Sequence, residues 1–265
     1  MNKILKPLTM IKKIKSIINR ILVKYNHPEL QSGKIIRIED AKKVANAYSQ
    51  NGSFDDPISF LGKKGIGYSG ANKNLTEIFN GVELGTWAID SQTIDWIWDY
   101  LSTHKPNTIL EFGSGSSTCL FCAWMKKYNP KGLIISIEQN PEEAKNTSKK
   151  LYSHNIAEYG HVLSMDVDSQ GQIILDQEKI KSILNDRKFD LVFIDGPAGP
   201  NGCRENTLPS SIPLLSSSAS WFLHDSYRIG ELEILNKWSK LKGISAIGIV
   251  ALGNGLGIGT WESPN

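Results

Sequence analysis

The sequence predicts an α/β fold, in which a doubly wound, mostly parallel sheet with a terminal antiparallel strand follows a helical N-terminal extension. From Pro106 to Trp261, short apolar runs alternate with stretches of helical length. The runs are continuously apolar, which indicates parallel strands that are buried on both faces by helices. The last two runs are separated only by Gly253–Gly255. So short a connection predicts an antiparallel hairpin at the end of the sheet.

The elements of this region can be placed in order. We expect strands at Thr108–Phe112, Leu133–Ile137, His161–Met165, Leu191–Ile194, Ser220–Leu223, Ile244–Ala251 and Gly257–Trp261. We expect helices between them at Ser117–Tyr128, Pro141–Ser153, Gln177–Asn185 and Ile229–Leu241. A further helix near Gln92–Ser102 would begin at Asp90 or Ser91, because either side chain can accept hydrogen bonds from the first free backbone amides.

The chain divides into three predicted regions, which are a basic amphipathic helix (1–26), an N-terminal extension or lid (27–85) and the main domain (86–265). In the first region apolar residues recur at helical spacing, and the basic residues meet no acid before Glu29. This apolar stripe must pack against the domain, against a second subunit or on an anionic lipid surface. The second region contains a short helical pattern around Glu39–Ser49.

Composition narrows the class of protein. A net charge of +3 over 265 residues is too small to indicate a nucleic-acid partner. We expect neither a signal peptide nor a membrane span, since no run approaches ~20 apolar residues. Three cysteines suit a reduced cytoplasmic protein, and Cys119 and Cys122 are interpreted as small buried helix residues rather than a redox or metal pair. If the basic helix binds lipid, the protein would lie peripherally on the inner membrane face.

Acidic side chains end or follow the predicted parallel strands. They are Glu111, Glu138, Asp166 and Asp195. The first of them stands two residues before the turn Gly113–Gly115, whose glycines let the backbone approach a ligand closely. In an open parallel sheet, ligands bind at the carboxyl ends of the strands, and an acid after the second strand can accept hydrogen bonds from a ribose diol. The four carboxylates at this edge therefore predict a site that binds a cation or sugar hydroxyls.

The segment Glu111-Phe-Gly-Ser-Gly-Ser-Ser-Thr118 resembles the first motif of class I S-adenosylmethionine (SAM)-dependent methyltransferases, in the form found in O-methyltransferase-like members. Residues 189–197 and 221–225 resemble the fourth motif and the fifth strand of that family. The resemblance covers Trp87 to Trp261 and implies a Rossmann-like fold with SAM as cofactor. It implies that the glycine loop holds the methionine part of SAM, Glu138 the ribose and Asp166 or its neighbour the adenine. The implied cofactor-binding residues are Glu111, Gly113, Ser114, Gly115, Ser116, Ser117, Glu138, Asp166 and Asp195.

Candidate catalytic residues follow the fourth and fifth parallel strands, and they are Asp195, His224 and Asp225. His224 could act as a general base near neutral pH, or it could be structural. In family members that resemble catechol methyltransferase, acids matching Asp195 and Asp225 bind a divalent ion, so the resemblance allows a Mg²⁺ site here. The third ligand is usually Asn or Asp, whereas this chain has Ser226. Asp225 could instead cap the following turn.

The loop Gly196–Ser211 is rich in Gly, Pro, Asn and Ser, and we expect it to line the acceptor pocket. Arg204 and Arg228 could attract an acidic acceptor, but they are better interpreted as solvated loop residues. The sequence thus predicts methyl transfer to oxygen of a small molecule or a sugar by an enzyme of class EC 2.1.1.

Two other functions remain open. A dehydrogenase on the same fold would need G-x-G-x-x-G, but Thr118 stands where the third glycine belongs and Glu111 would repel a pyrophosphate. A non-catalytic adaptor that binds membrane or protein through residues 1–26 would not need the acids at the strand ends.

Overall fold

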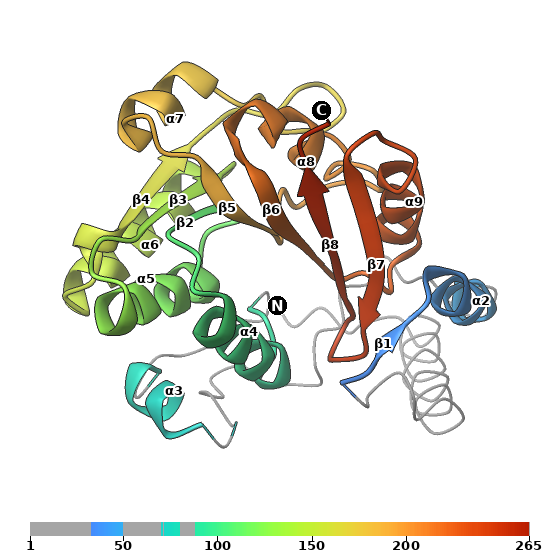
Figure 1. The fold of residues 1–265 in the computed structure, drawn as a ribbon, viewed down its shortest axis with the longest axis horizontal. Coiled ribbons are helices and arrows are strands. Elements are labelled where there is room, and N and C mark those ends of the chain that lie inside the picture. Colours follow the sequence, from blue (N-terminus) through green and yellow to red (C-terminus); the bar gives the residue numbers. More distant parts are fainter. Residues whose placement is uncertain (1–32, 50–69, 71, 80–87, 265) are drawn as a thin grey trace, which may run out of the picture.

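The computed structural model describes residues 33–49, 70, 72–79 and 88–264. Within them, eight strands form one sheet in the order β1-β7-β8-β6-β5-β2-β3-β4 (Figure 1). The strands are β1 (Ile35–Ile36), β2 (Thr108–Phe112), β3 (Leu133–Glu138), β4 (Gly160–Ser164), β5 (Phe189–Ile194), β6 (Leu215–His224), β7 (Ile244–Val250) and β8 (Leu256–Glu262). Strands β2 to β6 pair in parallel, whereas β8 is antiparallel to both β6 and β7. The predicted doubly wound sheet with a terminal antiparallel strand is confirmed.

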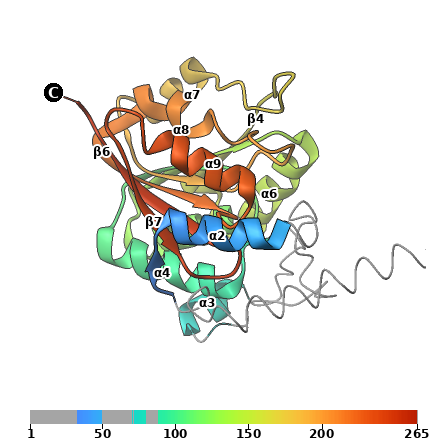
Figure 2. The ribbon, with the colours of Figure 1, turned by 90° about the vertical axis from the view of Figure 1, so that its right-hand side faces the viewer.

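The helices cover both faces of the sheet (Figure 2). They are α2 (Ile38–Ser49), α3 (Lys73–Ile78), α4 (Ser91–His104), α5 (Ser116–Tyr128), α6 (Pro141–Ser153), α7 (Gln177–Leu184), α8 (Thr207–Ser211) and α9 (Ile229–Trp238). Buried residues of α2, α7, α8 and α9 join one apolar cluster, and those of α3, α4, α5 and α6 join another on the opposite face. Every residue of β2 and β3 is buried. Because neighbouring residues of a strand point to opposite faces of the sheet, and helices cover both faces, the protein has two apolar cores.

Local signals explain most element boundaries. The Asp90 side chain accepts hydrogen bonds from the backbone N–H of Gln92 and Thr93 at 3.0 Å, so the predicted cap of α4 is confirmed. Strand β6 begins five residues earlier than predicted. Its polar start pairs with the last strand at Ser218 and Ala219, and this long-range pairing is not visible in the local pattern.

The N-terminal region contributes to the sheet. Strand β1 pairs antiparallel with β7, and Ala41 of α2 belongs to the same apolar cluster as residues of α9. The helical pattern predicted at Glu39–Ser49 is confirmed by α2. The helix predicted over residues 1–26 lies outside the described residues, and the boundary at residue 86 stays a prediction.

Among the helices that the structure describes, none is long and apolar enough to cross a membrane. Cys119 and Cys122 are buried on α5 and are free thiols, as predicted.

Candidate active site

The carboxyl ends of the parallel strands gather the predicted site residues at one edge of the sheet. The chain runs outward from β2 to β3 and β4 on one side and returns through β5 and β6 on the other. The edge between β2 and β5 is therefore the point where strand order reverses, and ligands of such folds bind there. Glu111 and Glu138 lie in β2 and β3, Asp195 directly follows β5, and His224 ends β6.

The turn after β2 crosses the turn after β5 at two glycines. Gly113 has φ +91°, and a Cβ on it would lie 2.9 Å from the backbone N of Gly196 and 3.0 Å from the backbone of Asp195. A Cβ on Gly196 would lie 2.8 Å from Gly113. The contact places the glycine loop directly beside Asp195. By contrast, nothing lies within 4 Å of a Cβ built on Gly115, so the start of α5 borders open space.

Substitution of Gly113 by alanine is expected to destabilise the protein by about 1–3 kcal/mol or more. Part of this cost is the left-handed backbone, and the rest comes from the collision with two backbone segments that cannot move away independently. Urea unfolding of Gly113→Ala against wild type measures the effect. Gly115→Ala is the matched control, and its unfolding midpoint should stay close to wild type. Equal midpoints for both variants would contradict the packing described for Gly113.

Glu111 is fully buried and only partly satisfied. The Thr118 hydroxyl donates to its Oε2 at 2.5 Å, whereas its Oε1 accepts no hydrogen bond from the described residues. Burial raises the pKa of Glu111 to about 7, although the hydroxyls of Ser117, Ser136 and Thr118 lower it in part. Buried oxygens normally have a partner, so Oε1 fits a donor supplied by a ligand. The ammonium group of SAM is a donor of this kind.

Glu138 is 9 % exposed and is held in place by the glycine loop. Its Oε2 accepts from the backbone N–H and the hydroxyl of Ser114, at 2.9 and 3.2 Å, and its Oε1 accepts from the N–H of Asn140 at 2.9 Å. These bonds fix the carboxylate without filling all of its acceptor positions. Ser116 begins α5, and Asp166 is exposed beyond the end of β4. All the predicted cofactor residues thus lie at this edge of the sheet, in the strand ends, in the loops or at the start of α5, while their roles stay predictions.

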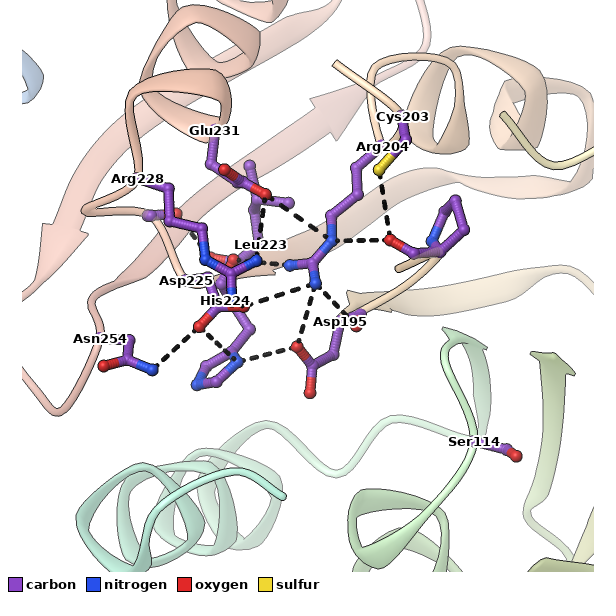
Figure 3. Close-up of polar contacts among 12 residues, drawn as sticks. Ser114, Asp195, Cys203, Arg204, Leu223, His224, Asp225, Arg228, Glu231 and Asn254 are labelled. Atoms are coloured by element: carbon purple, nitrogen blue, oxygen red, sulfur yellow. Dashed lines mark hydrogen bonds and ion pairs between the residues drawn. The ribbon is translucent and has the colours of Figure 1, made fainter. Parts of the chain in front are cut away.

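The three predicted catalytic residues meet beside the glycine loop, as Figure 3 shows. Nδ1 of His224 lies 2.8 Å from Oδ1 of Asp195 and 3.6 Å from Oδ1 of Asp225. Because an ionised carboxylate only accepts hydrogen bonds, Nδ1 must carry the proton of that bond. Nε2 of His224 is buried and has no partner among the described residues. In the neutral imidazole, this nitrogen holds the free lone pair.

Two arginines complete the cluster. Arg204, from the loop after β5, is 4 % exposed and forms ion pairs with Asp195, Asp225 and Glu231 at 3.6, 3.4 and 3.8 Å. Nη2 of Arg228 lies 2.9 Å from Oδ2 of Asp225. The interpretation of Arg204 as a solvated loop residue is therefore wrong, because its charge is buried against three carboxylates.

The charges of the cluster shift its pKa values in opposite directions. Burial disfavours the imidazolium of His224, but the carboxylates of Asp195 and Asp225 outweigh burial and raise the pKa of His224 to about 9. Burial by itself would raise the pKa of Asp225, but the positive charges of His224, Arg204 and Arg228 lower this pKa below its usual value. Burial also raises the pKa of Glu231, against the two arginines.

The residues that the sequence suggested for Mg²⁺ are brought together, yet their surroundings do not suit a divalent ion. Ligand atoms of Asp195, His224 and Asp225 all lie within 4.8 Å of one another. However, both oxygens of Asp225 already have partners, because Asn254 donates to Oδ1 at 3.0 Å, while Oδ2 accepts from Arg204 at 3.4 Å and forms an ion pair with Arg228. A second positive charge there would meet two guanidinium groups. Within the part of the chain that the structure describes, the partners of the Asp225 carboxylate are side chains rather than the backbone N–H groups of the following turn.

Sequence reasoning missed three members of the cluster, which are Arg204 as a buried cation, Glu231 and Asn254. Glu231 lies in the first turn of α9 and Asn254 in the turn between β7 and β8. Each looks like an ordinary polar residue at the surface. The loop Gly196–Ser211 also contains the helix α8, which was not predicted. Nε1 of Trp238 in α9 donates to the backbone oxygen of Glu205, and this hydrogen bond anchors the loop to α9.

Comparisons with known proteins indicate the kind of domain that carries this site. Residues 110–226 match a family model described as a methyltransferase domain. No curated protein matches the chain significantly.

Solved structures share the fold at low identity. A methyltransferase from Geobacter sulfurreducens is 15 % identical, with a TM-score of 0.50 over 86 % of this chain and 100 % of that one. An O-methyltransferase from Bacillus cereus in complex with SAH is 12 % identical, with a TM-score of 0.52 over 78 % of this chain and 96 % of that one. The O-methyltransferase TomG from Streptomyces achromogenes in complex with SAM is 13 % identical, with a TM-score of 0.50 over 87 % of this chain and 100 % of that one. At such identities the likeness establishes a common fold.

Proposed function

We propose a specific reaction for this chain, whose residues 110–226 match a family model described as a methyltransferase domain, and we infer that it is a class I SAM-dependent enzyme. The enzyme transfers the methyl group of SAM to an oxygen of a small molecule or a sugar, and His224 is the general base. The observation that carries the proposal is the buried, unpartnered Nε2 of His224, whose other ring nitrogen is fixed by Asp195 beside the glycine loop.

The cofactor side is assigned to the carboxyl ends of β2 and β3 and to the loops that follow them. Glu111 Oε1 would accept from the ammonium group of SAM, and the Glu138 carboxylate would accept from the ribose hydroxyls. The open space beside Gly115 would admit the methionine part. When bound, SAM supplies an electrophilic methyl group, so the protein needs only to align the acceptor, exclude water and remove a proton.

The acceptor side is assigned to His224 and Asp195. Nε2 takes the proton of the acceptor hydroxyl as the oxygen forms its bond to the methyl carbon and the carbon–sulfur bond breaks. The products are the methyl ether, SAH and a proton that returns from Nε2 to solvent. Asp195 orients the ring and stabilises its positive charge, in the way that a carboxylate supports histidine in other base-catalysed reactions. The O-methyltransferases that share the fold support oxygen as the atom methylated.

A labelled-SAM transfer assay tests this function. Purified protein is incubated with methyl-labelled SAM and the small-molecule fraction of a cell extract, and mass spectrometry identifies the product. Label on an oxygen of a small molecule or sugar is the expected result, and label on nitrogen, carbon or protein only would contradict it. The melting temperature of the protein should rise when SAM or SAH is added but not when NAD is added. A rise with NAD alone would favour a dehydrogenase.

Membrane contact through residues 1–26 is a separate part of the proposal, supported by their seven basic residues and apolar spacing. Each basic residue near an anionic surface contributes about 1 kcal/mol. The full chain should therefore float with anionic liposomes, less so at high salt, whereas a truncated chain that begins at His27 should not. Full-length protein that stays with the dense fraction would instead favour packing within the molecule or in a homodimer.

A further inference from the structure

Arg204 occupies the position between two strand ends where the family resemblance would put a cation. Its side chain comes from the loop after β5 and points between Asp195 and Asp225 (Figure 3). Nη2 lies 3.6 Å from Oδ1 of Asp195 and 3.4 Å from Oδ2 of Asp225. The guanidinium therefore faces the same two carboxylates that a divalent ion would need.

Backbone oxygens supply the remaining partners of this guanidinium. Nη2 donates to the carbonyl oxygen of Asp195 at 3.0 Å, Nη1 to that of His224 at 3.2 Å, and Nε to that of Pro197 at 3.3 Å. Carboxylate and carbonyl oxygens are the ligands that hard cations such as Mg²⁺ and Ca²⁺ prefer. Here the same kind of oxygen shell surrounds a permanent organic cation, which cannot lose its charge at any working pH.

The charge balance leaves little place for another cation. Asp195, Asp225 and Glu231 supply the acids, and Arg204, Arg228 and His224 oppose them within one buried cluster. A divalent ion on Asp225 would have to share Oδ2 with Arg204 and Arg228 or Oδ1 with Asn254.

We propose that Arg204 is a positioning residue that replaces a divalent metal, so that methyl transfer proceeds without one. The inference rests on the proposed function. By binding the carbonyl oxygens at the ends of β5 and β6, Arg204 holds these strand ends together. It thereby keeps Oδ1 of Asp195 on Nδ1 of His224 and leaves Nε2 directed at the acceptor.

The first test asks whether the wild-type full chain binds a metal. Protein treated with chelator is titrated with Mn²⁺ alone, and binding is followed by electron paramagnetic resonance. No stoichiometric binding is expected up to millimolar Mn²⁺, and SAH affinity and label transfer should be the same with and without chelator. Binding of one Mn²⁺ that is lost in Asp225→Asn would overturn the proposal, as would transfer that chelation abolishes and Mg²⁺ restores.

The second test removes the cation. Arg204→Met should lower label transfer by about 100-fold, because small displacements of catalytic groups have effects of this size, while SAH affinity stays within about twofold. Arg204→Lys keeps the charge and should recover part of the rate. Added guanidinium ion should also recover part of the rate of Arg204→Met. A folded Arg204→Met that transfers at the wild-type rate would contradict the assigned role.

Two measurements keep the test decisive if Arg204→Met does not fold or if the acceptor differs from the proposed one. Arg204→Met combined with Glu231→Gln removes one buried acid together with the cation, which restores the charge balance. In this folded variant, the imidazole of His224 is titrated by NMR. Compared with Glu231→Gln alone, the pKa of His224 in the double variant should move upward, because these two proteins differ only by the loss of the nearby cation. An unchanged titration would indicate a purely structural Arg204. Both this titration and the Mn²⁺ experiment stand even if no label transfer is found in the wild type, in which case only the proposed function fails.

Discussion

The substitution His224→Ala is expected to lower the rate of methyl transfer by about 10²–10⁴-fold, which is the usual contribution of a general base. Nε2 of His224 is the buried, unpartnered nitrogen beside Asp195, and alanine removes it. The affinity for SAM should be unchanged, because the proposed cofactor contacts lie on the loops after β2 and β3. Label transfer to the product identified from the extract measures the rate, and calorimetry with SAH measures cofactor binding.

The matched control is His161→Ala, which removes an exposed histidine near the start of β4, away from the site edge. It should transfer methyl groups at the wild-type rate. Comparable activity in His224→Ala and His161→Ala, with both proteins folded, would rule out His224 as the base.

The same assignment predicts a pH dependence. The base must be neutral, and the carboxylates of Asp195 and Asp225 raise the pKa of His224 to about 9 against the effect of burial. At pH 7, roughly one imidazole in a hundred is then neutral, so the rate should rise about tenfold per pH unit and level off near pH 9. Asp195→Asn removes one of these charges and should move the midpoint to lower pH. A profile that is flat from pH 7 to 9 would contradict the proposal.

The second large effect is expected at the cofactor. Glu138→Ala should weaken SAM binding by about 10–100-fold, since hydrogen bonds from ribose hydroxyls to a carboxylate contribute about 1.5–3 kcal/mol. The carboxylate also accepts from Ser114, so part of the loss will come from a less ordered glycine loop. Calorimetry with SAM measures the affinity. Glu142→Ala, an exposed acid in the first turn of α6, is the control and should bind as wild type does.

Local patterns located the half of the candidate site that is assigned to the cofactor. Thr108–Phe112 is a short, mostly apolar run that contains Glu111 and is followed by a glycine turn, and its strand boundaries agree with the structure. Glu111 and Glu138 could be assigned because a strand, its terminal acid and the next turn are contiguous in sequence. Their placement then follows from the rule that parallel strands end at one edge.

The acceptor side could be predicted only in part. Asp195, His224 and Asp225 follow strands that the pattern identified, so their meeting was expected. Their partners come from other elements of the structure, since Arg204 lies in the loop after β5, Glu231 in α9 and Asn254 in the hairpin turn. Whether a polar residue on a loop is solvated or buried depends on which segments pack over it. The residues next to it in the sequence do not reveal that packing.

The sequence by itself determined the parallel sheet, the antiparallel hairpin, the glycine loop and the acids at the strand ends. Periodicity and turn chemistry act over a few residues, so they can be recognised without knowledge of the fold. Only the tertiary structure decided that Gly113 and Gly196 cross and that β1 extends the sheet at β7. It also decided that a guanidinium rather than solvent faces Asp195 and Asp225. These features depend on contacts between segments far apart in the chain, where burial turns an ordinary loop arginine into the central charge of a site.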